Sequence, residues 1–404
     1  MESAEHTSHR DATRAAMAIA PGVLLAGIAG GIAFPILPVV GLRAGLPLAF
    51  IGVILAANRA ARVVVNPFVG HLTDRVGGRR TLLLGLAIQI AVMALYWLGV
   101  RTGRPGPYFL AGRLLHGPGS SCVFVAGQAL ALEAGGKVHG GRVGGAVRAA
   151  MGVGVPIGLV MGGLLSDAIG EAHTFELAAV AMALATLVAT WLVPDVRVAV
   201  RAATSLLTAA RALLDRRLAA LGGLNFAATF AASGMVLTTI VFLLRARHLS
   251  VLHLTERGTS SAFMGLLVIT EAAFMPVFGR LGDRGRNHAT IGAAGLALLV
   301  PSLVVIALAQ TAIVLAIGVA LLGVGTAALG PSVLALVADT VAPERTGIAV
   351  GALQVCGDLG GAAGPLIGTA LFSSRVELPY FASAAVVLAL MPAAIWLARE
   401  PRRR

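Results

Sequence analysis

The chain has 404 residues, of which 57% are hydrophobic and only 12% are charged. A soluble protein of this length needs a more polar surface, because polar residues normally cover the outside of a fold. Apolar runs of about 20 residues recur along the chain, which is the length that crosses a bilayer as a helix. The composition therefore excludes an ordinary soluble protein and predicts an all-α membrane protein.

The apolar runs predict twelve transmembrane helices. A polar segment, residues 1–14, comes first and lacks the short apolar core of a cleavable signal peptide. The predicted spans are 15–40, 47–70, 80–100, 107–133, 142–166, 173–193, 217–244, 258–279, 289–309, 312–338, 346–373 and 378–398.

An even number of spans places both termini on one side of the membrane. The connections on that side, together with the two tails, carry most of the 31 Lys and Arg residues. This bias predicts that both termini are cytoplasmic. The net charge of +13 is then a consequence of topology, with membrane lipids rather than nucleic acid as the partner.

Two motifs occur twice, which predicts a duplicated six-span unit. The stretch GHLTDRVGGRR, residues 70–80, returns as GRLGDRGR, residues 279–286. Glycines spaced by four in the fifth span have counterparts at nearly the same offset in the eleventh. We therefore expect two parallel six-helix bundles, residues 1–194 and 218–404, joined by a cytoplasmic connector, residues 195–217.

These motifs carry a family resemblance over nearly the whole chain. The first stretch resembles the signature of the major facilitator superfamily (MFS) between spans two and three, and RLLHGPG, residues 113–119, resembles its span-four signature. The glycines at 145–163 resemble the signature of the twelve-span drug:proton antiporters. The resemblance implies export driven by a proton gradient, without a cofactor, through rocking of the two bundles. The chain departs from these signatures at Gly78, His116 and Leu159.

We call the stretches 70–80 and 279–286 the hinges, and the four-spaced glycines of the fifth and eleventh spans the glycine ladders. Both are predicted to gate transport. Asp74 can face the positive end of a neighbouring helix, with Glu133 as a partner for one of the hinge arginines. Four-spaced glycines let helices approach closely, either as tight packing alone or as a seam between the bundles. The predicted gating residues are Gly70, Asp74, Arg75, Gly77, Arg79, Glu133, Asp283, Arg284, Gly145, Gly154, Pro156, Gly158, Gly162, Gly360, Gly364 and Pro365.

Charged residues inside the spans are the next candidates, because each costs roughly 2.5–3.5 kcal/mol at the bilayer centre and so faces a cavity or a partner. Glu271 and Asp358 are the predicted protonatable groups; the alternative is a structural ion pair, for instance Arg62 with Glu271. Arg113 is predicted to tune a nearby carboxyl or to hold an anionic group; the alternative is a head group that reaches the membrane surface. With Arg59 included, these charged residues are three arginines and two acids. The resulting excess of positive charge suits an anionic substrate.

Polar residues within the spans are candidates for substrate binding. Each is also able to form an ordinary hydrogen bond between helices, as are Ser233 and Thr238. The predicted substrate-binding residues are Asn58, Arg62, Arg59, His116, Gln128, Asn225 and Gln354.

The sequence argues against several other chemistries. It has no metal-ligand spacing, no phosphate-binding loop and no nucleophile–base pattern, so we expect neither an enzyme nor an ATP-driven pump. The two cysteines lie within spans and predict core thiols rather than a disulfide. No obligate protein partner is evident.

The leading prediction is a proton-coupled exporter of small amphipathic molecules. The alternatives are uptake or exchange of an organic anion, and a non-transporting receptor or lipid-interacting scaffold. A composition rich in Gly, Ala and Arg, with Lys137 as the single lysine, suggests the inner membrane of a bacterium.

Overall fold

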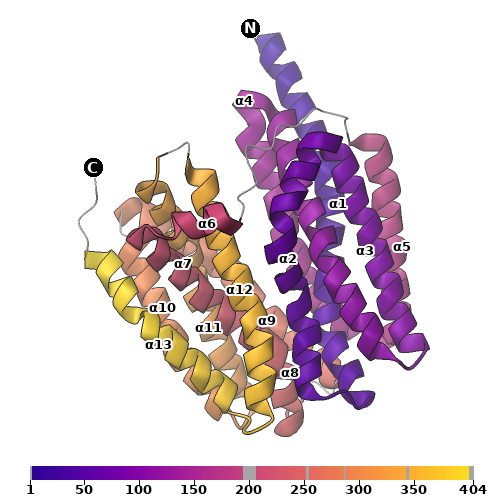
Figure 1. Ribbon diagram of the computed structural model, residues 1–404, viewed down its shortest axis with the longest axis vertical. Helices are drawn as coiled ribbons and strands as arrows, with labels where there is room; N and C mark the ends of the chain where they lie inside the picture. The colour runs from indigo at the N-terminus through magenta and orange to yellow at the C-terminus, as the bar shows by residue number, and fades with distance from the viewer. Residues whose placement is uncertain (1, 194–205, 252–253, 286–287, 343–344, 400–404) are drawn as a thin grey trace. The chain divides into compact units, whose positions relative to one another are not determined.

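The computed structural model describes residues 2–193, 206–251, 254–285, 288–342 and 345–399, and for residues 2–16, 134–142 and 206 it describes the backbone alone. The described chain is helical apart from short connections (Figure 1). Its helices are α1 (Glu2–Arg43), α2 (Leu48–Val76), α3 (Gly78–Arg101), α4 (Pro105–Ile169), α5 (Glu171–Leu192), α6 (Leu206–Ala212), α7 (Arg216–Thr229), the π-helical η1 (Phe230–Val236), α8 (Leu237–Ala246), α9 (Glu256–Gly285), α10 (His288–Leu308), α11 (Ala312–Thr340), α12 (Thr346–Phe372) and α13 (Leu378–Arg399).

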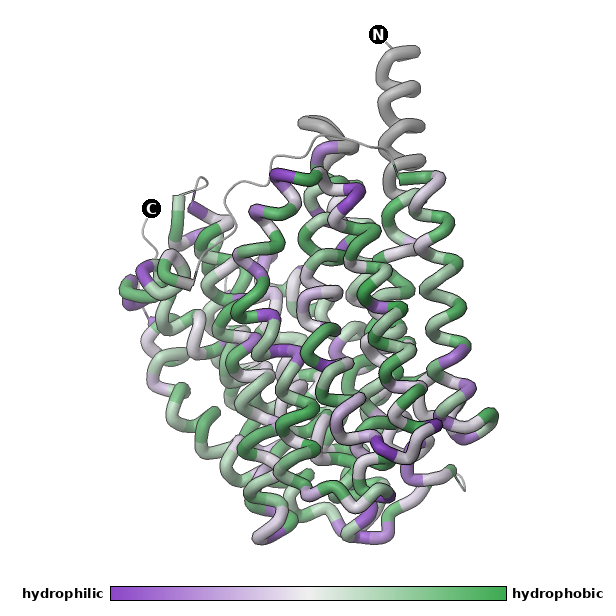
Figure 2. The backbone as a smooth tube through the Cα atoms, turned by 45° about the vertical axis from the view of Figure 1, so that its right-hand side comes forward, coloured by the Kyte–Doolittle hydropathy of each residue, from purple (hydrophilic) through white to green (hydrophobic). Residues whose placement is uncertain are grey.

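The helices have the length and hydropathy of membrane spans. Within the described residues, 11 helical stretches qualify, among them Arg216–Ala246, which joins α7, η1 and α8. The stretch at 105–133, which holds Arg113 and His116, is not one of these, because its polar residues lower its mean hydropathy. Hydrophobic residues dominate the middle of the helices (Figure 2). The prediction of an all-α membrane protein is confirmed.

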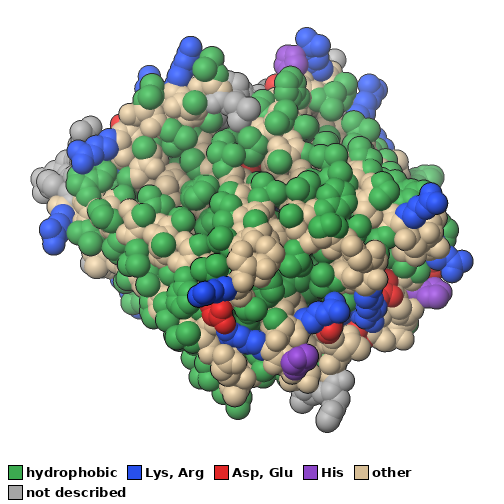
Figure 3. All heavy atoms as spheres, turned by 60° about the horizontal axis from the view of Figure 1, so that its bottom comes forward, with side chains coloured by type: hydrophobic (Ala, Val, Ile, Leu, Met, Phe, Trp, Pro, Cys, Tyr) green, Lys and Arg blue, Asp and Glu red, His purple; other side chains and the backbone are tan. Residues whose placement is uncertain are grey.

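The surface agrees with this assignment. Large hydrophobic side chains are exposed on many helices, for example Phe68, Trp191 and Ile313. Hydrophobic side chains also cover most of the face drawn in Figure 3, where the charged side chains stand in small groups. Because exposed apolar surface of this extent is unfavourable in water, these side chains are suited to contact with lipid.

Helix α4 joins two predicted spans that were expected to be separated by a loop. Its backbone is helical from Pro105 to Ile169. The chain nevertheless turns back within it, since the Cβ position of Gly127 is 3.7 Å from Val147 and that of Gly144 is 3.3 Å from Leu132. Residues 20 apart in a straight helix would be about 30 Å apart. The stretches 105–133 and 143–169 therefore pack as an antiparallel pair.

The first hinge is more helical than predicted. Helix α2 was expected to end at Gly70 but continues to Val76, and α3 begins at Gly78. Gly77 joins them with φ 93°, a backbone conformation that side chains with a Cβ rarely adopt. Asp74 therefore lies in the last turn of α2 rather than in a loop.

The chain forms two compact units. Unit 1 contains residues 1–44 and 64–203, and unit 2 contains residues 45–63 and 204–404. This grouping differs from the two predicted bundles in placing the first half of α2 with the second part of the chain. The physical reason is close packing against α12: a Cβ on Gly52 would lie 2.7 Å from the Pro365 carbonyl oxygen.

Each glycine ladder packs helices together inside one unit. In unit 1, a Cβ on Gly154 or Gly158 would overlap the backbone of α1, and one on Gly162 would lie 2.6 Å from the Ile32 carbonyl oxygen. In unit 2, a Cβ on Gly360 would lie 2.5 Å from the Phe226 carbonyl oxygen, and one on Gly364 would overlap the backbone of η1. Tight packing, one of the two interpretations, accounts for these glycines. The other interpretation, in which these glycines form a seam between the two bundles, stays a prediction.

Candidate functional site

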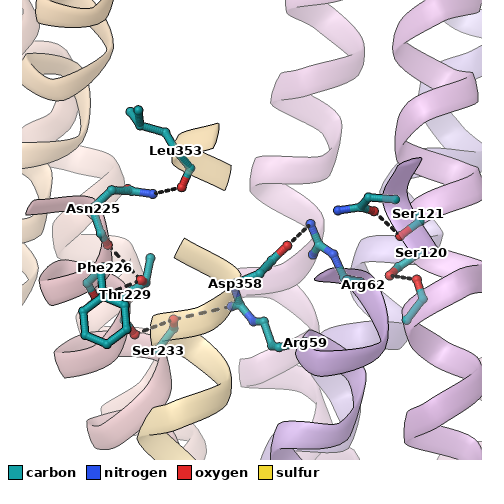
Figure 4. Close-up of polar contacts among 12 residues, drawn as sticks. Arg59, Arg62, Ser120, Ser121, Asn225, Phe226, Thr229, Ser233, Leu353 and Asp358 are labelled. Carbon is teal, nitrogen blue, oxygen red and sulfur yellow. Dashed lines mark hydrogen bonds and ion pairs between the residues drawn. The ribbon is translucent and has the colours of Figure 1, made fainter. Parts of the chain in front are cut away.

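Unit 2 contains a cluster of one buried acid and two half-buried arginines, which sequence analysis selected separately. Asp358, on α12, is fully buried. Arg59 Nη1 lies 3.3 Å from Asp358 Oδ1, and Arg62 Nη2 lies 3.5 Å from Asp358 Oδ2. Figure 4 shows both arginines pointing from α2 toward the carboxylate. The partner of Arg62 is thus Asp358, not Glu271.

Local sequence explains the geometry of this cluster. Arg59 and Arg62 are three residues apart on a helix and so lie on neighbouring positions of one face. On α12, Gly361 follows Asp358 at the same spacing, and a Cβ there would lie 3.0 Å from the Arg59 guanidinium carbon. A glycine therefore lets the guanidinium lie against the backbone of α12. Gly361 was missed as a site residue, although the Gly360–Gly361 doublet in the ladder was a visible signal.

Helix α7 and the π-helical turn η1 complete the site. Asn225 Nδ2 donates to the Leu353 carbonyl oxygen at 2.8 Å, which joins α7 to α12. One turn further, the Thr229 hydroxyl donates to the Asn225 carbonyl oxygen at 2.8 Å. Arg59 Nη2 then donates to Ser233 Oγ, on η1, at 3.4 Å. π-Helical turns occur often at functional sites, because they re-aim side chains within a helix.

The cluster is electrostatically unusual for a buried site. Two permanently charged guanidinium groups share one carboxylate within the described part of unit 2. Burying such an ion pair adds little stability, whereas removing one partner costs about 3–5 kcal/mol, because it leaves an uncompensated charge. The carboxylate has two states that differ in charge, so protonation of Asp358 would alter every ionic contact in the cluster.

Glu271 lies elsewhere in unit 2, on α9. Its carboxyl lies near the Thr326 side chain, on α11, whose hydroxyl donates to the carbonyl oxygens of Leu322 and Gly323. Gly323 lets these helices approach, since a Cβ there would lie 2.6 Å from the Leu267 carbonyl oxygen. The structure therefore separates the two predicted protonatable groups by environment: Asp358 contacts arginines and Glu271 contacts a hydroxyl.

A second buried arginine, Arg113, lies in unit 1. It is 1% exposed, so its head group is buried in the protein. The guanidinium carbon lies 5.1 Å from the centre of the Phe34 ring and close to the Tyr96 hydroxyl. Nearby in sequence, His116 Nδ1 and Gln89 Oε1 are 2.8 Å apart. Gln89 and Tyr96 were missed, because a single polar residue in an apolar span resembles ordinary helix packing.

The remaining predicted residues are dispersed. Asn58 is buried and its Oδ1 accepts no hydrogen bond from the described residues, Gln128 is half-buried, and Gln354 is exposed. Neither cysteine forms a disulfide.

The two hinges make different contacts. In the first, Asp74 and Arg75 are exposed, as is Glu133, and Arg79 donates to the Thr190 carbonyl oxygen near the end of α5. In the second, His288 Nε2 lies 3.2 Å from Asp283 Oδ1.

The apolar spans, the repeated glycine packing and the buried charges define a multi-pass membrane protein with an internal polar site. The family model described as Major Facilitator Superfamily matches residues 19–365 and 258–404. The chain therefore belongs to the major facilitator superfamily and is a transporter of that class.

Individual relatives match over short stretches. The uncharacterized MFS-type transporter YttB of Bacillus subtilis is 32% identical over 126 residues, which is 30% of this chain and 30% of that protein. The human synaptic vesicular amine transporter is 28% identical over 131 residues, 31% of this chain and 24% of that protein. The matched part thus spans less than a third of either relative.

Solved structures share the fold over almost the whole chain. The human organic anion transporter MFSD10 superimposes with a TM-score of 0.70 and 20% identity, covering 95% of this chain and 99% of that one. A bacterial homologue of the human lysosomal transporter Spinster superimposes with a TM-score of 0.77 and 12% identity, covering 96% of this chain and 97% of that one. At these identities the likeness concerns the fold alone.

Proposed function

We propose that the protein is a proton-coupled secondary transporter of small amphipathic molecules in which Asp358 carries the coupling proton. The observation that carries this proposal is the buried carboxylate between Arg59 and Arg62. Acidic residues inside membrane spans commonly mark proton pathways. Protonation would cancel the charge of Asp358 and weaken both ion pairs, so proton binding would change the contacts between α2 and α12.

The direction of transport has two candidates. Export by exchange with protons is supported by the resemblance of the glycines at 145–163 to the antiporter signature. Uptake or exchange of an organic anion is supported by the excess of arginine over acid in the cluster. Both directions fit alternating access by rocking, with the proton gradient as the energy source and no cofactor. The charge bias of the loops supports cytoplasmic termini. The composition rich in Gly, Ala and Arg supports a bacterial inner membrane.

Roles for the other predicted residues follow from their surroundings. Glu271 is the second candidate for a proton site, since the neutral hydroxyl of Thr326 leaves its charge uncompensated by that contact. Arg113 holds its position through aromatic neighbours and would stabilise the shape of unit 1. Asn58 and Gln354 lie on the two helices that form the cluster and would contact the substrate there.

The test uses proteoliposomes with a pH indicator inside. A panel of amphipathic carboxylates and amines is added under an imposed pH gradient, and proton movement and counterflow are recorded. We expect at least one compound to move protons, and we expect Asp358→Asn to abolish that movement. Asp339→Asn, which changes an exposed carboxylate on α11, is the matched control and should behave like the unmodified protein.

Glu271→Gln should reduce proton movement less than Asp358→Asn does. Proton-dependent transport that persists unchanged in Asp358→Asn would overturn the assignment. A protein that moves none of the compounds, and no protons in response to them, would count against transport of this class.

A further inference from the structure

The arginine pair offers more hydrogen-bond donors than Asp358 uses. Each guanidinium presents a planar fork of N–H groups that matches both oxygens of a carboxylate. In the cluster, each arginine reaches Asp358 through a single nitrogen, at 3.3 and 3.5 Å. Arg62 Nε is buried and donates to no described acceptor. One carboxylate therefore leaves part of this donor set unused.

The charges of the cluster are also unbalanced. Arg59 and Arg62 carry two positive charges against the single negative charge of ionised Asp358. On α7 and η1, the polar side chains described at this site are Asn225, Thr229 and Ser233, none of which titrates near neutral pH. The excess of one positive charge in a partly buried site favours the arrival of an anion.

The arginines are more accessible than the acid. Their side chains are 23% and 17% exposed for Arg59 and Arg62, whereas that of Asp358 is 0% exposed. A ligand can therefore reach the guanidinium groups without first displacing α12. The acid lies behind them and acts as their internal counter-ion.

Asn58 provides an independent sign of a ligand. It precedes Arg62 by four residues, so both side chains lie on one face of α2. Asn58 is 7% exposed, and its Oδ1 accepts no hydrogen bond from the described residues. A buried polar atom without a partner is uncommon and costs about 1–3 kcal/mol. A bound molecule with a carboxylate and a nearby donor group would satisfy both Arg62 Nε and Asn58 Oδ1.

We propose that Arg59 and Arg62 bind the carboxylate of an organic acid substrate, and that Asp358 occupies their donors until it is protonated. The proposal rests on the proposed function, because it uses the same acid as the proton site. Ionised Asp358 repels a second carboxylate, whereas protonated Asp358 does not. Substrate and proton would therefore bind together rather than in competition. This favours transport of an organic anion with a proton over export by exchange.

The experiment measures binding to the purified full-length protein in lipid nanodiscs. The probes are benzoate, benzamide and benzylamine, together with the corresponding naphthalene compounds, which share one ring system and differ in charge. We expect the two carboxylates to bind about tenfold or more tightly than their neutral amides, as charged hydrogen bonds do. Arg59→Gln and Arg62→Gln should each weaken carboxylate binding by about tenfold. Arg148→Gln, which removes an exposed arginine on α4, should leave it unchanged.

The direction of the change in benzoate affinity in Asp358→Asn separates the proposal from a purely structural ion pair. Removing the internal competitor should make benzoate bind more tightly, even though proton coupling is lost. In a weakly buffered solution, benzoate binding to the unmodified protein should also take up protons.

Weaker benzoate binding in Asp358→Asn, proton release on binding, or no preference for either carboxylate would overturn the inference. Tighter binding of benzylamine together with intact proton coupling would overturn the inference alone and leave the proposed function standing. Carboxylate binding without any proton-coupled transport would instead contradict the proposed function.

Discussion

The buried arginines of the two units are held by different chemistry. In unit 1, Arg113 lies against the Phe34 ring and close to the Tyr96 hydroxyl, and Tyr96 meets Phe109 edge to face. In unit 2, Arg59 and Arg62 meet a carboxylate. Neither an arginine nor an aromatic ring changes charge near neutral pH, whereas a carboxylate can. The cluster of unit 2 therefore contains a carboxylate whose protonation would change its contacts with two arginines.

The helix packing of the two units, by contrast, is similar. The glycines of α4 pack on α1 in unit 1, and those of α12 pack on α7 and η1 in unit 2. The two glycine ladders thus make similar backbone contacts, whereas the polar groups of the two units differ. The residues that hold the fold are therefore distinct from the residues that carry charge chemistry, and substitutions in the two sets should have different effects.

The largest effect is expected from filling the glycine ladders. Gly158→Ala and Gly364→Ala place a Cβ into the backbone of α1 and η1, so the helices must move apart. We expect each variant to lose about 1–3 kcal/mol of stability, measured as thermal unfolding in detergent. Gly145→Ala is the matched control, because its Cβ would meet nothing within 4 Å. Equal stability of all three variants would show that the ladders do not hold the units together.

An intermediate effect is expected at Arg113. Arg113→Lys keeps the charge but loses the planar contact with Phe34, so stability should fall by about 0.5–2 kcal/mol. The pH dependence of transport should be retained, because the charge change is placed at Asp358. If Arg113→Lys unfolds normally but its transport no longer depends on pH, the coupling site would lie in unit 1, and the contrast drawn between the units would be wrong.

The smallest effect is expected at the hinges. Asp74→Asn should favour inward-open states, because an acid near the positive end of a helix contributes about 0.3–1 kcal/mol. The corresponding Asp283→Asn removes the acid that lies 3.2 Å from His288 and should shift the equilibrium by a similarly small amount. Cysteine accessibility on both sides of the membrane measures the shift. Equal accessibility in all variants would contradict the predicted gating role of Asp74 and Asp283.

Sequence alone predicted the fold and the charged residues, for a clear physical reason. Charges inside apolar spans are rare, so Arg59, Arg62 and Asp358 were visible without a structure. Their pairing was not, because 299 residues separate Arg59 from Asp358 and only the packing of α2 against α12 brings them together. The ion pair named as an example of the structural alternative, Arg62 with Glu271, followed the repeat rather than the packing, and the structure pairs Arg62 with Asp358 instead.

Other errors came from weak local signals. The glycine-rich stretch between the fourth and fifth spans resembles a loop, yet its backbone is helical. The π-helical turn at η1 has no sequence signature, and it changes which face of the helix Ser233 occupies. The contact of Ser233 with Arg59 could therefore not be predicted. Gly361 was hidden beside a glycine that fits the ladder. In each case the information lies in contacts between helices and not in the periodicity of one helix.

The antiparallel pair inside α4 bears on how the protein enters its membrane. The stretch 105–133 contains Arg113, His116 and Gln128, and it is not among the described helices apolar enough to span alone. Its neighbour, residues 143–169, is apolar enough to span the membrane alone. Insertion depends on the hydrophobicity of each segment as it leaves the translocon. We therefore expect the first stretch to enter only together with the second, as a hairpin. An in vitro insertion assay that compares residues 105–133 with residues 105–169 tests this, and efficient insertion of the shorter segment would disprove it.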